Sequence, residues 1–309
     1  MKLAFLYAGQ GAQHVGMGRD LYEIYPAFRQ VLDSAPVDFD LKKLCFDGPE
    51  DQLNDTRYTQ PCMVAFAAGV TALLREAGIT PDYAAGLSLG EYSALQCAGV
   101  FDAKTAISLV AFRGQAMADA VQGRPCGMAA VLGMDRDALK AVCAEASDAG
   151  VVECTNFNCP GQIVISGDAA AVDKAGELAK AAGAKRVLPL KVSGPFHTSL
   201  MAPAGDALRE KFQSVDFGAM EIPVLFNCLG DLKGEADTIP NLLEQQVQSS
   251  VYLEDTIRRL GELGVDTVVE IGPGRTLSGF VKKTVKGIKC YPVETAEELQ
   301  AAIAALRGE

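Results

Sequence analysis

The sequence lacks the residue patterns that build metal centres and disulfide frameworks. Its 309 residues include only two histidines, His14 and His197, and nine cysteines scattered along the chain. The number of cysteines is odd, and no CxxC pair or Cys/His cluster has the spacing of metal ligands. We therefore expect no metal site, and we expect the cysteines to be reduced thiols, mostly small residues of the core.

Long apolar runs and positive charge are also lacking. No uncharged apolar stretch reaches the ~18 residues that cross a bilayer, and residues 1–8 lack the pattern of a signal peptide. The chain has 28 Lys and Arg against 39 Asp and Glu, a formal net charge of −11, whereas nucleic-acid partners favour a basic surface. We expect a cytoplasmic protein that binds neither membrane nor nucleic acid.

Strands alternate with helices along much of the chain. Short apolar runs at residues 3–7, 83–87 and 268–272 each lead into a glycine-bearing turn. A helical pattern follows the second and third runs, and this order is typical of an α/β fold with a mainly parallel sheet. A further helix is expected to begin near Thr59, with that threonine as its cap and Pro61 in its first turn.

Residues 125–195 have a different order of elements. The patterns predict strands at 128–132, 151–156, 162–166 and 186–191, and helices at 135–149 and 169–182. This β-α-β-β-α-β order indicates a small ferredoxin-like (split βαβ) subdomain. We expect it to be inserted in a larger α/β domain formed by residues 1–124 and 196–309.

Residues 86–90, Gly-Leu-Ser-Leu-Gly, have the G-x-S-x-G form of a nucleophile elbow. Side chains at the two glycine positions would clash in such a tight strand-to-helix turn, while Ser88 is exposed at a helix N-terminus. The Leu89 N–H then faces a developing oxyanion. A tight turn with an incidental serine is the alternative interpretation.

A serine nucleophile needs a base, and the chain offers only two histidines. His197 lies in a constrained Ser-Gly-Pro-Phe-His-Thr turn before another helix, and we take it as the base; His14 is expected to be a surface or loop residue. Gln10, in the Gly-Gln-Gly turn after the first strand, is a second candidate oxyanion donor through its N–H. Arg113 follows an apolar stretch and offers two N–H donors to a carboxylate.

Several sequence blocks occur together in the order known from one enzyme family. The blocks are GQGAQ (9–13), GLSLGEY (86–92), RG (113–114), NFNCPGQIVISG (156–167), FH (196–197) and EIGPG (270–274). Over essentially the whole chain the sequence resembles the malonyl-CoA:acyl carrier protein transacylases and the related acyltransferase domains of polyketide synthases.

The resemblance implies a hydrolase-like large domain with the ferredoxin-like insertion, and an active site in the groove between them. It implies that Ser88 takes the malonyl group from malonyl-CoA and passes it to the phosphopantetheine thiol of acyl carrier protein, in a ping-pong reaction that supplies fatty-acid synthesis and uses no cofactor. His197 would be the base, Gln10 and Leu89 the oxyanion donors, and Arg113 the partner of the malonyl carboxylate.

The resemblance also assigns residues around this centre. Asn156, Asn158 and Gln162 match the polar strand of the family's groove, and Gln246 matches a glutamine near the carbonyl that steadies the histidine. Phe196 matches members that accept malonyl rather than methylmalonyl groups, because its ring fills the space of an α-methyl. Three positions depart from the family pattern. Leu87 stands where the family usually has His, Ser250 where it usually has Pro, and Leu253 where it usually has Trp.

Two other functions use the same residues. A thioesterase or esterase would transfer the acyl group to water, but Arg113 and the missing Ser-Asp-His order of α/β-hydrolases disfavour it. A non-catalytic carrier-binding scaffold would be expected to lose Ser88, His197 or Arg113. The densest basic stretch, formed by Arg275, Lys282, Lys283, Lys286 and Lys289, is either a carrier-docking surface or a solvated helix face.

Overall fold

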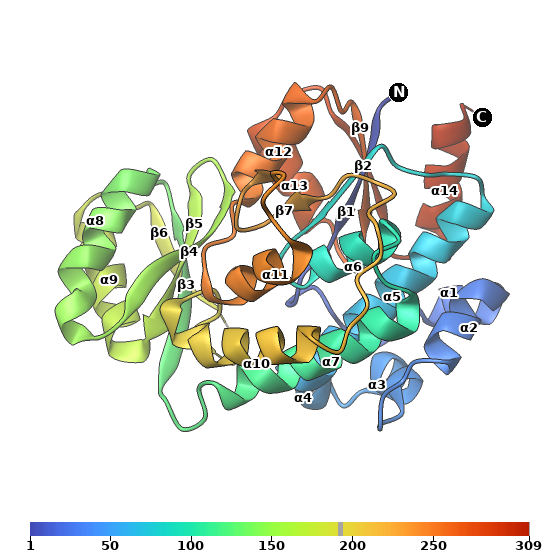
Figure 1. The fold of residues 1–309 in the computed structure, drawn as a ribbon. Helices are drawn as coiled ribbons and strands as arrows, with labels where there is room; N and C mark the ends of the chain where they lie inside the picture. Colours follow the sequence, from blue (N-terminus) through green and yellow to red (C-terminus); the bar gives the residue numbers. More distant parts are fainter. Residues whose placement is uncertain (191–193, 309) are drawn as a thin grey trace. The chain divides into compact units, whose positions relative to one another are not determined.

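The computed structural model describes residues 1–190 and 194–308, and these form two compact units (Figure 1). The first unit comprises Met1–Gly114, Asp216–Leu225 and Arg258–Glu309, and the second comprises Gln115–Val215 and Phe226–Ile257. Residues 191–193, which end the last predicted strand of the ferredoxin-like subdomain and begin the His197 turn, lie outside the described residues. The predicted domain boundaries, at 124/125 and 195/196, stay a prediction.

A four-stranded parallel sheet forms the centre of the first unit. Its strands are β1 (Leu3–Tyr7), β2 (Tyr83–Gly86), β9 (Thr267–Ile271) and β10 (Lys289–Val293), in the order β10-β9-β1-β2. Tyr7 pairs with both Gly86 and Ile271, and Ile271 pairs with Val293, so the four strands end at one level. The loops that follow them therefore leave the same edge of the sheet, where parallel α/β proteins place their sites.

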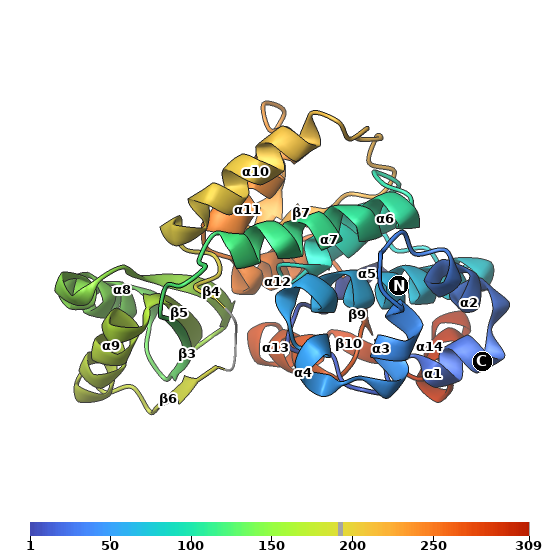
Figure 2. The same cartoon turned by 90° about the horizontal axis from the view of Figure 1, so that it is seen from below.

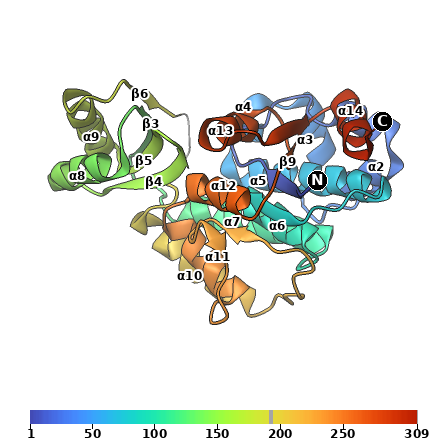
Figure 3. The same ribbon diagram turned by 90° about the horizontal axis from the view of Figure 1, so that it is seen from above.

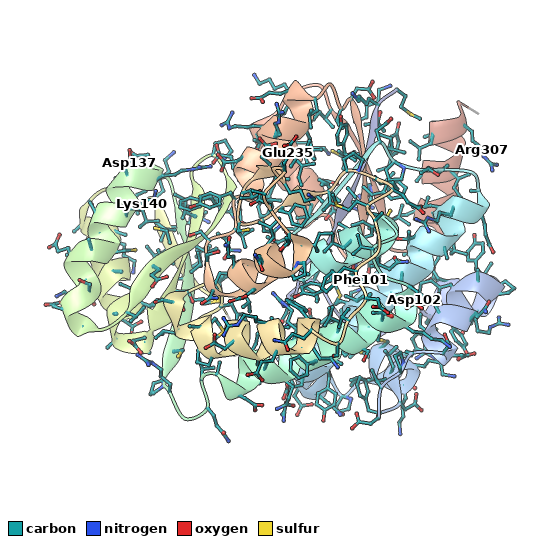
Figure 4. All side chains as sticks on the ribbon, viewed as in Figure 1. Phe101, Asp102, Asp137, Lys140, Glu235 and Arg307 are labelled. Carbon is teal, nitrogen blue, oxygen red and sulfur yellow. The ribbon has the colours of Figure 1, made fainter. Side chains whose placement is uncertain are left out.

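Helices flank this sheet. They are α1 (Arg19–Ile24), α2 (Pro26–Asp33), α3 (Leu41–Asp47), α4 (Glu50–Leu53), α5 (Thr56–Glu76), α6 (Gly90–Cys97), α13 (Thr276–Thr284) and α14 (Ala296–Arg307). Figure 2 shows α13 and α14 beside β10. Helix α7 (Ala103–Asp119) begins in this unit and ends in the second. The Asp102 carboxylate, labelled in Figure 4, accepts the Thr105 N–H at 2.7 Å at its start.

The prediction for the start of α5 was wrong. The helix begins at Thr56, and its cap is Asp55, whose side chain accepts the Arg57 N–H at 3.0 Å. Thr59 lies inside the first turn, and its hydroxyl donates to the Leu53 and Asp55 carbonyls. A carboxylate serves as well as a hydroxyl at a helix start, so two cap residues close together in the sequence compete. Nearly every residue from 59 to 74 is buried, so the helix is packed on several sides.

The second unit contains a four-stranded antiparallel sheet with two helices on one face (Figure 3). The elements are β3 (Cys126–Leu132), α8 (Arg136–Ala146), η1 (Ser147–Ala149), β4 (Val152–Cys159), β5 (Gln162–Asp168), α9 (Ala169–Ala181) and β6 (Arg186–Pro189). The sheet order is β4-β5-β3-β6, the arrangement of a ferredoxin-like module. The predicted fold class, an α/β domain with a parallel sheet plus a ferredoxin-like subdomain, is confirmed.

One hydrophobic core joins the sheet and the two helices of this module. Leu139 of α8, Ile165 of β5 and Ala175 of α9 are among its fully buried members. The part of α8 that faces away from this core carries charged residues such as Asp137, which Figure 4 labels. The unit also contains β7 (Leu225–Phe226), which begins at its boundary, β8 (Asp231–Leu232), η2 (Ser199–Met201), α10 (Ala202–Phe212), α11 (Ile239–Gln248) and the first half of α12 (Leu253–Glu262).

Within residues 1–190 and 194–308, no helix has both the length and the apolarity that crossing a membrane requires.

Candidate active site

Ser88 lies on the turn between β2 and α6, as the elbow pattern predicts. Its φ is 51°, a left-handed value that non-glycine residues rarely adopt. A Cβ on Gly86 would come within 2.0 Å of the Gly90 carbonyl carbon, and a Cβ on Gly90 would come within 2.2 Å of the Tyr7 carbonyl oxygen. The two glycines therefore let strand, turn and helix approach closely enough to hold Ser88 in this conformation.

Two N–H groups near the turn are available to a ligand. Neither the Leu89 N–H nor the Gln10 N–H donates a hydrogen bond to another of the described residues. The loop of Gln10 approaches the elbow closely, since a Cβ on Gly9 would lie 2.6 Å from the Leu87 carbonyl oxygen. Both N–H groups thus meet the requirement for oxyanion donors, which must be preorganised and unsatisfied before the substrate arrives.

Arg113 brings a positive charge to the nucleophile. Its Nη2 donates to Ser88 Oγ at 3.2 Å and its Nη1 donates to Gln60 Oε1 at 3.0 Å. The side chain is 1% exposed. Burial lowers the pKa of Arg113, and the neighbouring Tyr92 and Glu91 offset part of that effect. A guanidinium keeps its charge even so, and a buried guanidinium is a strong partner for a carboxylate.

The sequence interpretation missed two residues around Arg113. Gln60 lies on α5, is fully buried and accepts from the guanidinium; the Tyr92 ring lies on α6 with its centroid 5.3 Å from Arg113 Cζ, a cation–π contact. Gln60 could have been noticed in the sequence, because it is a polar residue at the start of an otherwise apolar stretch of α5. Its partner, 53 residues away, could not be read from the sequence.

His197 lies in the second unit, in the turn before η2. It is 3% exposed and has a φ of 63°. Its Nδ1 lies 2.7 Å from the Gln246 carbonyl oxygen. A carbonyl only accepts, so Nδ1 carries the proton in the neutral ring and Nε2 is left with a lone pair. This is the tautomer that a general base needs. Gln246, predicted near this histidine, contacts it through its backbone.

The other predicted groove residues also lie in the second unit. Asn156 and Asn158 are buried on β4, and Gln162 is half-buried at the start of β5. Among the described residues, no hydrogen-bond partner reaches the buried Asn158 Oδ1. Such a buried acceptor is costly unless a ligand or water satisfies it. Phe196 is buried, and a Cβ on Gly194 would lie 3.0 Å from its ring.

The three departures from the family pattern have structural explanations. Leu87 packs its side chain against Gly9, since a Cβ there would lie 3.2 Å from Leu87 Cγ. The Ser250 hydroxyl donates to the Cys154 carbonyl at 2.8 Å, which ties the Gln246 segment to β4 without a proline. Leu253 is fully buried at the start of α12.

Backbone strain singles out the predicted nucleophile and the predicted base. Among the non-glycine residues that the structure describes, only Ser88 and His197 have positive φ. Each such conformation costs about 1–3 kcal/mol and is retained mainly at functional sites. The first unit thus carries a strained serine with a guanidinium and two N–H donors, and the second carries a strained histidine whose Nδ1 donates to a backbone carbonyl. These are the groups of acyl transfer through a serine ester.

Comparison with known proteins gives the same class. A family model described as an acyl transferase domain matches residues 4–304. The malonyl CoA-acyl carrier protein transacylase of Bacillus subtilis is 44% identical over 100% of this chain and 98% of its own length. That of Clostridium perfringens has a solved structure that is 38% identical, with a TM-score of 0.96, covering 100% of this chain and 98% of its own.

A third relative was solved with its partner. It is a malonyl-transacylase in complex with its type II polyketide-synthase acyl-carrier protein, 39% identical, with a TM-score of 0.95 and full coverage of both chains. Full-length identity at this level shows the family. The chain belongs to the acyl transferase domain family, among the malonyl CoA-acyl carrier protein transacylases.

Proposed function

We propose that Ser88 is the nucleophile of a malonyl-CoA:acyl carrier protein transacylase. The chain is an [acyl-carrier-protein] S-malonyltransferase that supplies malonyl groups to fatty-acid synthesis. The observation that carries the proposed site is the hydrogen bond from Arg113 to Ser88 Oγ. A fixed cation beside the nucleophile suits an acyl group that bears its own carboxylate, and malonyl is such a group.

In the first half-reaction Ser88 Oγ attacks the thioester carbonyl of malonyl-CoA. His197 Nε2 takes the hydroxyl proton, and the Gln10 and Leu89 N–H groups stabilise the oxyanion. The C–S bond then breaks, His197 returns the proton to the CoA sulfur, and a malonyl ester remains on Ser88. Arg113 releases Ser88 Oγ and binds the malonyl carboxylate.

The second half-reaction runs the same steps backwards with a different thiol. The phosphopantetheine thiol of acyl carrier protein gives its proton to His197 and attacks the malonyl ester. The ester C–O bond breaks, and Ser88 recovers a proton from the imidazolium. A base without a carboxylate partner can suffice, because a thioester is an activated acyl donor and the carbonyl of Gln246 already orients the ring.

The buried Phe196 ring limits the acyl group next to His197. We expect Phe196→Ala to raise the use of methylmalonyl-CoA relative to malonyl-CoA about 10-fold, because one methyl in a pocket contributes ~1–3 kcal/mol. Competition between the two donors, read by the masses of the adducts, measures the ratio. An unchanged ratio would remove Phe196 from the selectivity of this site.

Acyl carrier protein is the second substrate. Four exposed lysines lie close together in the sequence: Lys282 and Lys283 on α13, Lys286 in the turn after it and Lys289 at the start of β10. None of them forms an ion pair with another described residue. Arg275, predicted in the same basic stretch, is paired with Glu298 at 2.6 Å. The four lysines offer an acidic carrier a basic surface on an acidic protein.

We expect the double change Lys282→Glu and Lys286→Glu to raise the KM for acyl carrier protein about 10-fold or more, because rim charges act on encounter with a charged partner. The KM for malonyl-CoA should stay the same. Lys174→Glu with Lys180→Glu on α9 makes the same change in net charge elsewhere and serves as the control. No effect on either substrate would indicate a solvated helix face, and an equal effect on both would also reject a docking role.

We place the enzyme in the cytoplasm, because its relatives act with acyl carrier protein and the nine cysteines need a reducing compartment to stay thiols.

The function is tested with malonyl-CoA alone, followed by acyl carrier protein. Wild-type protein quenched in acid before the carrier is added should show a malonyl adduct in its intact mass, and the adduct should move to the carrier afterwards. Free malonate with no adduct would favour the hydrolase. Neither product would favour a non-catalytic scaffold.

A further inference from the structure

The loop that carries Gln10 has few backbone ties. The Ala8 N–H donates to the Ile271 carbonyl at 3.0 Å and the Gly16 N–H donates to the Cys45 carbonyl at 2.8 Å. Between these two points, no backbone–backbone hydrogen bond joins the loop to another element among the described residues. The position of the Gln10 N–H therefore depends on side-chain contacts.

Three side chains make those contacts. Gln10 Nε2 donates to Thr56 Oγ1 at 2.9 Å, and Gln13 Nε2 donates to Asn54 Oδ1 at 2.7 Å. Both of these lead to the start of α5. The third contact runs the other way, from His14 Nε2 to the Glu294 carboxylate after β10. It is the one ion pair of the three. Only this contact therefore becomes weaker when the histidine loses its proton.

The surroundings of His14 fit the charged imidazolium. Nε2 lies on the Glu294 carboxylate and Nδ1 lies 3.0 Å from the Val15 carbonyl oxygen. Both partners only accept, and a neutral imidazole has one N–H to give, so both contacts require the doubly protonated ring. Partial burial lowers the pKa of His14, but the contacts with Glu294 and Val15 outweigh it and raise the pKa above its usual value.

Glu294 carries the contact on to the catalytic edge of the sheet. Its other carboxylate oxygen accepts the Gly274 N–H at 2.8 Å, in the turn after β9. That turn touches the start of the Gln10 loop, because a Cβ on Gly272 would lie 2.4 Å from Ala8 Cβ. His14 and Glu294 thus join the loops after β1, β9 and β10. The charged groups on the elements packed around the pair are Arg19, Asp20, Asp47, Arg275, Glu297 and Glu298.

We infer that His14 is a positioning residue, whose imidazolium holds the Gln10 loop against Glu294 and so places the Gln10 N–H for oxyanion binding. The inference rests on the proposed role of Gln10. The imidazolium is 51% exposed, and an ion pair so exposed contributes little to global stability. Its effect is on loop position: it is complete below the usual pKa of His14 and is lost as pH rises through the raised pKa.

The test compares the rate of Ser88 malonylation in wild type, His14→Lys and His14→Gln from pH 6 to 9. The lysine keeps the charge throughout this range and the glutamine never has it. Dividing each rate by that of His14→Lys at the same pH cancels the pH dependence that all other titrating groups contribute. The wild-type ratio should fall from the lysine level to the glutamine level as pH rises, by about 3- to 10-fold, less than the 10²–10³ that a missing oxyanion donor costs.

The control is Lys174→Gln, which removes an exposed ion pair with Asp148 in the other unit and keeps His14, so its ratio should follow the wild-type curve at every pH. A second readout needs no activity. The two histidines give two imidazole NMR signals, which His14→Lys assigns, and the Gln10 amide shift should titrate with His14. A wild-type ratio that does not change with pH, or a Gln10 amide shift that does not titrate with His14, overturns the inference. Absence of any Ser88 adduct instead overturns the proposed function.

Discussion

Ser88→Ala is expected to abolish the malonyl adduct and to lower the rate of malonyl transfer about 10⁴- to 10⁶-fold, the range found when a serine nucleophile is removed from a hydrolase. The alanine removes only the hydroxyl oxygen, so the steric fit of the turn between Gly86 and Gly90 is kept. Arg113 loses a partner at 3.2 Å but retains Gln60. Intact mass after an acid quench and the rate of carrier malonylation measure the two effects.

Two variants show that the loss comes from the hydroxyl. Ser93→Ala changes another buried serine on α6 and should leave both readouts at the wild-type level. Ser88→Cys keeps a nucleophile at the same atom position and should still form an adduct, now a thioester. A malonyl adduct of undiminished yield on Ser88→Ala would show that the nucleophile is elsewhere.

Arg113→Ala is expected to change the choice of acyl donor. The value of kcat/KM for malonyl-CoA should fall about 10²- to 10³-fold, because loss of one partner from a buried charge pair costs about 2–5 kcal/mol. Acetyl-CoA has no carboxylate, so its kcat/KM should change by less than about 10-fold. The ratio of kcat/KM for malonyl-CoA to kcat/KM for acetyl-CoA, measured at equal enzyme concentration, should therefore fall.

Arg113→Lys keeps the charge but not the two-pronged geometry, so it should recover part of the malonyl preference. Arg136→Ala, which removes a half-buried arginine paired with Asp255 in the second unit, is the control and should leave the ratio unchanged. If Arg113→Ala lowered kcat/KM equally for both donors, the arginine would support Ser88 or the fold without binding the carboxylate.

The elbow and the fold class could be predicted because their signals are local. A glycine two residues on either side of Ser88 is a steric requirement of one tight turn, and the structure meets it with separations of 2.0 and 2.2 Å for added Cβ atoms. The ferredoxin-like module follows from the order of six elements, each with its own periodicity. The start of α5 was misplaced because Asp55 and Thr59 both cap helices well.

The surroundings of the proposed catalytic groups could not be predicted in the same way. Gln60 reaches Arg113 across 53 residues, and the Gln246 carbonyl reaches His197 across 49. His14 was expected to be a surface or loop residue, and its partner Glu294 lies 280 residues further on. No periodic pattern relates such positions, because they meet only where separate strands and helices converge.

By itself the sequence determined the order of elements, the strained serine turn, the supply of only two histidines and the resemblance to one family. These depend on sterics and hydrogen bonding within a few residues, and on composition. The tertiary structure alone decided the tautomer of His197, the pairing of Arg113 with Ser88 and the ion pair of His14. These depend on which side chains the edge of the sheet and the packed helices bring within about 3 Å, the range of a hydrogen bond.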